Sequence, residues 1–176
     1  MLRGELETRR LLLRPFRGSD LDSLSELYSD AATMRFIGGV RTREQARNEL
    51  RDLIAGYELH GWGPRAITFD NTLIGRAGLW VHQVEGQREI EVAYMIGRPW
   101  WRQGYGSEAA LRFCDAAFGE LGLERLISLI DAENVPSIAI AKKNGMHHER
   151  DVIWNRLNTR LYSMTHDTWQ AQRDSR

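Results

Sequence analysis

Two acidic residues on a short alternating segment are the side chains of this sequence best placed to move a proton. Glu89 and Glu91 fall on one side of residues 88–97, where every second position is apolar. Partial burial between Ile90 and Val92 would raise the pKa of a carboxylate toward a value that suits a general base. We predict Glu91 as this base. Glu89 on the same face is the alternative, and a plain surface carboxylate is the other interpretation of Glu91.

A glycine-punctuated turn, WWRQGYGSEA at residues 100–109, is the second chemical feature. Gly104 and Gly106 permit left-handed backbone angles and leave room for a ligand. The turn leads into a helix predicted over residues 107–121, whose first free N–H groups point out of its end. We therefore expect a phosphate group bound by backbone amides, with Arg98 and Arg102 beside it, although glycines before a helix also form ordinary turns.

Composition excludes several classes of partner and site. Lys plus Arg and Asp plus Glu balance at 24 each, so the chain as a whole has no electrostatic attraction for nucleic acid or acidic membranes. The single Cys114 excludes an internal disulfide and a cysteine-based metal site. The stretch MLRGELETRR lacks the apolar core that is typical of a signal peptide, and no uninterrupted apolar run approaches the ~20 residues of a membrane span. We expect a cytoplasmic protein that binds no metal, nucleic acid or membrane.

The elements that must position these residues follow from apolar periodicity and capping residues. The sequence predicts one domain over residues 1–176, of α+β class, with a mixed and largely antiparallel sheet. Strands are expected at 8–16, 65–70, 72–84, 88–97, 125–130 and near 151–155 and 160–167. Helices are expected at 19–30, 43–60, 107–121 and 136–144.

The turn WWRQGYGSEA, followed by NVPSIAIAKKNGM at 134–146, resembles the GNAT acyltransferase superfamily, and in detail its ribosomal-protein N-terminal acetyltransferase branch. LETRRLLLRPFRGSDLDSL, IGRAGLW, EVAYMI and LYSMTHDTW occur in the order usual for that branch, from Leu6 to Trp169. The resemblance implies a GNAT fold with about six to seven strands and about four helices. It also implies that the parallel neighbours 88–97 and 125–130 splay apart at the cofactor site.

The resemblance further implies acetyl-CoA as the acyl donor and co-substrate. Its pyrophosphate would lie on the amides of residues 102–107, and its pantetheine arm would pair with backbone groups in the sheet opening. Asn134 would reach the pantetheine, although it also suits a helix cap, and Lys142 would approach the 3'-phosphate, although it also suits a helix end. The implied cofactor-binding residues are Met95, Ile96, Arg102, Gln103, Gly104, Tyr105, Gly106, Ser107, Asn134 and Lys142.

For the catalytic groups, the resemblance places Glu91 at an acidic position often seen in this branch. Ser137 matches the branch's serine three residues after Asn134 and is the predicted acid for the leaving thiolate. The sequence departs from a common family pattern at Ala141, where many members carry a tyrosine that could protonate the thiolate. Water is therefore an alternative proton source. A backbone N–H near Met95 or Ile96 is the expected donor to the carbonyl oxygen.

The function that follows is acetyl transfer from acetyl-CoA to a primary amine by direct attack in a ternary complex. A protein N-terminal amine is the first expectation by resemblance to the branch. Small-molecule amines, including amino acids and antibiotics, stay open as acceptors. The other function class is a non-catalytic acyl-CoA-binding or regulatory module, and a homodimer is compatible with either.

Overall fold

A computed structural model describes residues 2 and 4–175, which form one eight-stranded sheet with the order β1-β2-β3-β4-β5-β6-β8-β7. Every neighbouring pair is antiparallel except β5 and β6, which are parallel. The expected mixed, mostly antiparallel sheet is therefore confirmed. The strands are β1 (Leu6–Glu7), β2 (Leu12–Arg14), β3 (Arg65–Phe69), β4 (Thr72–Val84), β5 (Gln87–Ile96), β6 (Arg125–Asp131), β7 (His147–Trp154) and β8 (Leu157–Thr165).

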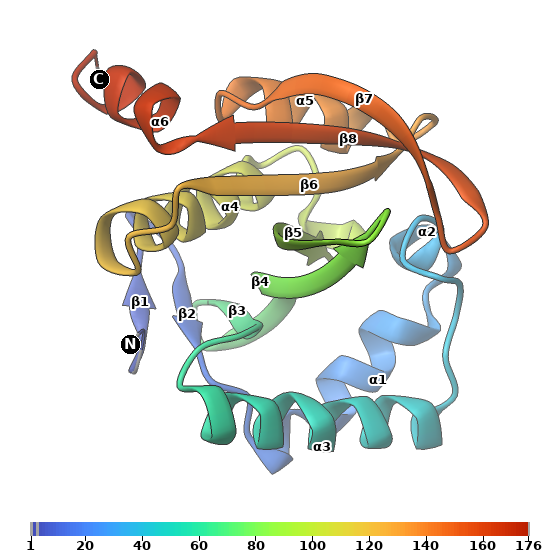
Figure 1. The fold of residues 1–176 in the computed structure, drawn as a ribbon. Coiled ribbons are helices and arrows are strands. Elements are labelled where there is room, and N and C mark those ends of the chain that lie inside the picture. The colour runs from blue at the N-terminus through green and yellow to red at the C-terminus, as the bar shows by residue number, and fades with distance from the viewer. Residues whose placement is uncertain (1, 3, 176) are drawn as a thin grey trace.

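Helices cover both faces of this sheet (Figure 1). They are α1 (Leu21–Ser29), α2 (Ala31–Met34), α3 (Arg43–His60), α4 (Tyr105–Asp115), α5 (Val135–Lys143) and α6 (His166–Arg173). In Figure 1, α1 and α3 lie together at the bottom of the view, whereas α4 and α5 lie behind β6 and β8. None of the helices in residues 2 and 4–175 combines the length and apolar character that crossing a bilayer requires.

The structure corrects the expected number of elements in two places. Within the segment predicted as a strand at 8–16, only Leu12–Arg14 is a strand, and an additional strand, β1, precedes it at Leu6–Glu7. Thr8 accepts the N–H of Leu11 at 2.8 Å in the turn between the two strands. The sheet thus has eight strands rather than six to seven. Two further helices were not expected: α2 is too short for apolar periodicity, and α6 has a single large apolar residue, Trp169.

The register of the β4–β5 hairpin decides which side chains share a face. Arg76 lies opposite Met95, and Trp80 lies opposite Glu91, so these four side chains point to the same side of the sheet. That side is covered by α1 and α3, since Met95 packs in the buried cluster of Leu24, Tyr28 and Leu50. The opposite side, with Val92 of β5 and Phe113 of α4, holds the larger apolar core.

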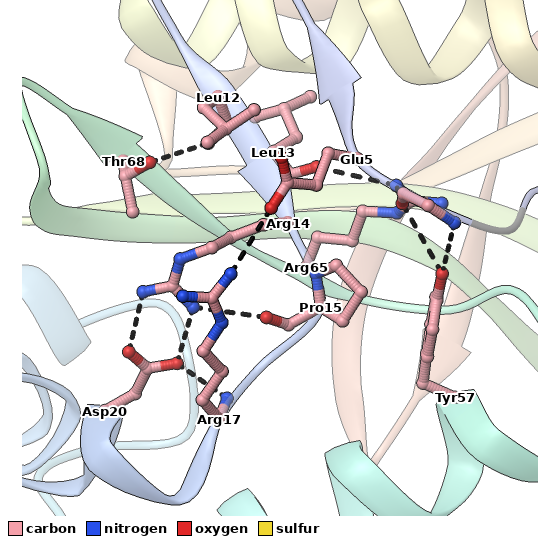
Figure 2. Close-up of polar contacts among 11 residues, drawn as sticks. Glu5, Leu12, Leu13, Arg14, Pro15, Arg17, Asp20, Tyr57, Arg65 and Thr68 are labelled. Carbon is pink, nitrogen blue, oxygen red and sulfur yellow. Dashed lines mark hydrogen bonds and ion pairs between the residues drawn. The ribbon is translucent and has the colours of Figure 1, made fainter.

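A buried arginine fastens the N-terminal segment to the sheet (Figure 2). Arg65 on β3 is fully buried, and its guanidinium donates to the carbonyls of Leu2, Gly4 and Leu13. The hydroxyl of Tyr57 on α3 accepts the N–H of Gly4 at 2.9 Å. The chain before β1 is thereby held by side chains from two elements, far from the parallel strand pair.

Candidate functional site

A cavity of about 690 Å³ lies where β5 and β6 part. Among the described residues, the parallel register of these strands consists of one pair, Glu91 opposite Ile127. The cavity is lined from the α1–α3 side by Glu91 and Met95, and from the opposite side by Tyr94 and Ser137. The opening between the strands therefore connects the two faces of the sheet, and a ligand can enter it from either one.

Glu91 lies in this opening with both carboxylate oxygens engaged. It is 8% exposed, and its Oε1 accepts the backbone N–H of Leu129 on β6 at 2.9 Å. Its Oε2 lies 2.8 Å from Nε2 of His82 on β4. The His82 ring in turn contacts Trp154 edge-on, with 4.8 Å between ring centroids. Glu91 and His82 thus form a carboxylate–imidazole pair, an arrangement that can hold and pass a proton.

Sequence reasoning missed His82, although the hairpin signal contained it. A turn at Glu85 and Gly86 fixes the register of the two strands and puts His82 on the same face as Glu91. Glu89, the alternative base, lies elsewhere. Its carboxylate pairs with Arg125 at 3.1 Å, and Glu89 is not among the residues that line the cavity.

The first turn of α5 forms the wall of the cavity opposite Glu91. Asn134 caps this helix, because its Oδ1 accepts the N–H of Ser137 at 3.3 Å. The capping interpretation of Asn134 is confirmed, and its amide NH₂ is not used by that bond. The hydroxyl of Tyr94 donates to the carbonyl of Ser137 at 3.4 Å, and burial raises the pKa of Tyr94 to about 12. Tyr94 therefore stays protonated and acts as a donor beside Ser137.

The glycine turn lies at the N-terminus of α4, outside the cavity lining. Gly104 is the N-cap with φ 83° and forms no side-chain cap, and Arg102 also has a positive φ of 62°. The first N–H groups of α4 have no capping side chain, which leaves them available to an anion. A helix start of this kind fits a phosphate, as the sequence predicts.

Side chains in the turn serve packing, which limits what they can give a ligand. Tyr105 is buried against Phe69, and the Arg10 guanidinium lies 4.5 Å from the centre of its ring. The Ser107 hydroxyl donates to Asn144 at 2.9 Å inside the protein. Tyr105 and Ser107 can therefore offer a ligand only their backbone N–H groups. Arg10, which sequence reasoning missed, reaches the turn from the distant N-terminal segment, but its charge is balanced by an ion pair with Glu108 of α4 at 2.7 Å.

Three further predicted residues differ in their surroundings. Met95 lines the cavity, but Ile96 does not. The Ile96 carbonyl accepts the indole N–H of Trp101 at 2.6 Å, so one of its lone pairs is already used. Lys142 is exposed in the last turn of α5 and lies outside the cavity lining.

The profile of the acetyltransferase (GNAT) domain matches residues 10–147 of this sequence. The chain belongs to the GNAT acetyltransferase family. Among curated proteins, it is 31% identical over 162 residues to the uncharacterized protein YkkB of Bacillus subtilis, covering 86% of this chain and 91% of the relative. It is 30% identical over 151 residues to the uncharacterized N-acetyltransferase YnaD of the same organism, covering 82% of this chain and 83% of the relative.

Solved structures agree with this GNAT assignment. An acetyltransferase of the GNAT family from Bacillus anthracis is 26% identical, with a TM-score of 0.79, covering 93% of this chain and 99% of that one. An aminoglycoside acetyltransferase solved in complex with coenzyme A has a TM-score of 0.80 at 14% identity, covering 93% and 99%. At that identity, the second likeness shows the fold alone. Within residues 2 and 4–175, no cluster of three or more His, Cys, Asp or Glu is arranged to hold a metal ion.

Proposed function

We propose that this GNAT protein transfers the acetyl group of acetyl-CoA to a primary amine by direct attack in a ternary complex. The observation that carries the proposal is the Glu91–His82 pair, which lies in a cavity open to both faces of the sheet. This arrangement supports a donor approaching from the α4–α5 side and an acceptor from the α1–α3 side. Two substrates that meet in one opening need no covalent enzyme intermediate.

The residues around the opening fit an acyl-CoA. The uncapped start of α4 supplies backbone N–H groups from residues 102–107 for a pyrophosphate, and Arg102 adds positive charge. Backbone groups near Met95 and the free amide of Asn134 supply partners for the pantetheine amides. Lys142 would serve the outer phosphate. Acetyl-CoA itself would supply the thioester carbon at which an amine can react.

The protein's main chemical task is to hold and remove a proton. A primary amine is cationic at neutral pH and cannot react until one proton is lost. Glu91 is our candidate base, with His82 as its hydrogen-bonded partner at 2.8 Å. The imidazole can share the proton that the carboxylate takes, or pass it to solvent at the mouth of the cavity.

At the other end of the opening, Ser137 is the candidate group for the leaving thiolate. Its hydroxyl lies in the first turn of α5 and lines the cavity. The Tyr94 hydroxyl lines the same wall, and its pKa of about 12 makes it a poor proton donor but a persistent hydrogen-bond donor. We propose that Tyr94 holds the first turn of α5 in place and that Ser137 gives a proton to the leaving thiolate.

The acceptor is proposed to enter through the loop after α2 and the β7–β8 hairpin. Phe36, Gly38, Trp154 and Leu157 line this mouth of the cavity. A free protein or peptide N-terminus is the first candidate. One screen tests the activity: thiol release from acetyl-CoA with a panel of primary amines and peptides. Stabilisation by CoA without thiol release for any amine would favour a binding module instead.

A further inference from the structure

The α1–α3 wall of the cavity holds two guanidinium groups that share one carboxylate. Arg41, in the loop after α2, forms an ion pair with Glu49 of α3. Arg76 of β4 also reaches Glu49, with 3.3 Å between Nη1 and Oε1. The Tyr28 hydroxyl donates to the same Oε1 at 2.8 Å. Glu49 therefore balances one of these two positive charges, so the cluster of Arg41, Arg76 and Glu49 carries a net positive charge.

Arg76 is the buried member of the pair. It is 9% exposed, and its Nε has no hydrogen-bond partner among the residues that the structure describes. Its guanidinium lies 5.6 Å from the ring centre of Tyr28 and 5.5 Å from that of Trp80. Aromatic faces attract a cation but do not neutralise it. A buried charge with incomplete pairing is costly, and an anion in the cavity would reduce that cost.

Among the described residues, Arg76 forms no ion pair with the carboxylates that line the cavity. Glu91 is engaged by His82 and the Leu129 N–H, and Asp131 accepts the N–H of Glu133 at 2.8 Å. Arg35, a third arginine in the lining, pairs at 3.2 Å with Glu133. Arg76 is therefore a buried cation whose carboxylate partner, Glu49, is shared with Arg41.

Resting on the proposed acetyl transfer, we infer that Arg76 is a specificity-determining residue that binds a carboxylate of the acceptor. Arg76 and Glu91 lie on the same face of the sheet. Glu91 is opposite Trp80, which is four residues along β4 from Arg76. Four residues correspond to about 13 Å along a strand. An acceptor held by both must therefore separate its amine from its carboxylate by several bonds. This geometry suits a peptide N-terminus with an acidic side chain nearby and disfavours a polycationic amine.

The test compares two dipeptide amides, glycyl-glutamate amide and glycyl-glutamine amide, which differ in a single charged group. Calorimetry in the presence of CoA gives their dissociation constants without requiring turnover. The wild-type protein is expected to bind the glutamate dipeptide at least tenfold more tightly. Arg76→Gln should remove this preference, and Arg76→Lys should keep part of it because the charge is kept but the planar fork is lost.

Two further variants separate recognition from folding. Glu49→Gln removes the competing carboxylate, so the preference for the glutamate dipeptide should grow if Arg76 binds an anion. Arg47→Gln is the matched control, because Arg47 is exposed on α3 and lines neither this cavity nor the neighbouring one that Arg76 and Glu49 also line. Arg47→Gln should keep the wild-type ratio. Stabilisation of each variant by CoA reports that it has folded.

The outcomes distinguish this inference from the proposed function. Equal binding of the two dipeptides by the wild type, or a preference that survives in Arg76→Gln, would overturn the role of Arg76. Acetylation of amines with no preference for acceptors that carry a nearby acidic side chain would also overturn the role of Arg76, but it would support acetyl transfer. Binding of the glutamate dipeptide without acetylation of any amine would support Arg76 as an anion site and count against the transferase.

Discussion

The carboxylate of Glu91 on β5 accepts the backbone N–H of Leu129 on β6 at 2.9 Å, across the opening between the two parallel strands. The Glu91 side chain thus accepts the Leu129 N–H at a point where β5 and β6 have separated and no backbone carbonyl of β5 takes that role. The same carboxylate is bound to His82 on its other oxygen. Glu91 therefore has a structural contact and a chemical one, and variants can separate them.

Replacing Glu91 by Gln should remove the base and keep the strand contact. The amide oxygen can still accept the Leu129 N–H, but it cannot take a proton from an amine. We expect kcat to fall roughly 100-fold or more, with the largest loss at lower pH, and CoA affinity to change little. Thiol release measured across pH, beside a CoA titration, checks this. Unchanged turnover would remove Glu91 from the chemistry.

Glu91→Ala is the companion variant, because it loses both contacts. It leaves the Leu129 N–H without its acceptor, which costs about 1–3 kcal/mol of unfolding free energy. Denaturant unfolding of the two variants should therefore show Glu91→Gln close to wild type and Glu91→Ala clearly weaker. If the two variants unfold alike, the strand contact adds nothing to stability.

Gly104→Ala should weaken CoA binding through the backbone of the turn. Gly104 has φ 83°, and an added Cβ would lie 3.3 Å from Nη2 of Arg10. A left-handed angle costs an alanine about 1–2 kcal/mol, so the turn relaxes and its N–H groups lose alignment. We expect the dissociation constant for CoA to rise about tenfold, as RT ln 10 is about 1.4 kcal/mol.

Gly122→Ala is the matched control for this turn. Gly122 has φ 65° and no neighbour within 4 Å of an added Cβ, and it follows the helical segment after α4. The same backbone strain arises there, away from the anion site. Calorimetry should show wild-type CoA affinity with reduced stability, and an equal loss of affinity in both variants would argue against the turn as the anion site.

The sequence predicts which segments form this candidate site, but the contacts between their side chains depend on strand register and on pairings between distant residues. The alternation of residues 88–97 and the glycines before α4 predict Glu91 on a strand and an anion site at a helix start. The pairing of Glu91 with His82 depends on a hairpin register that composition does not reveal. Arg10 and Arg76 were missed because their partners, Glu108 and Glu49, are distant in the chain. Roles set by such pairings emerge only once the chain has folded.

The ion pairs of Arg125 at the start of β6 should make stability depend on acid pH. Arg125 donates to Glu149 at 2.8 Å, and this hydrogen bond holds the pKa of Glu149 at about 2. A folded pKa below the unfolded value means that this stabilisation is complete above about pH 4.5 and is lost as pH falls toward about 2. Glu149→Gln should flatten the stability profile in that window.

Unfolding by denaturant at a series of acid pH values measures this effect. Glu133→Gln is the control, since it removes a carboxylate that is 75% exposed and belongs to a surface ion pair with Arg35. That variant should follow the wild-type profile. A Glu149→Gln profile as steep as that of the wild type would show that other carboxylates govern the acid response.

Arg65→Ala should loosen the N-terminal segment. The substitution leaves the carbonyls of Leu2, Gly4 and Leu13 without the guanidinium that binds them, and it opens a buried cavity. We expect a loss of roughly 3 kcal/mol in unfolding free energy, measured with denaturant. Arg9→Ala, an exposed residue nearby, should change it by less than about 0.5 kcal/mol. Equal effects would show that Arg65 holds nothing of consequence.

The most direct test of the central claim follows an isotope-labelled acetyl group from acetyl-CoA. Labelled acetyl-CoA, the wild-type protein and a panel of primary amines, including peptides with free N-termini, are incubated, and the products are analysed by mass spectrometry. The account predicts the label as an amide on an acceptor amine, in equal amount to the CoA thiol released, with Glu91→Gln strongly slower. CoA binding without label on any amine would contradict it.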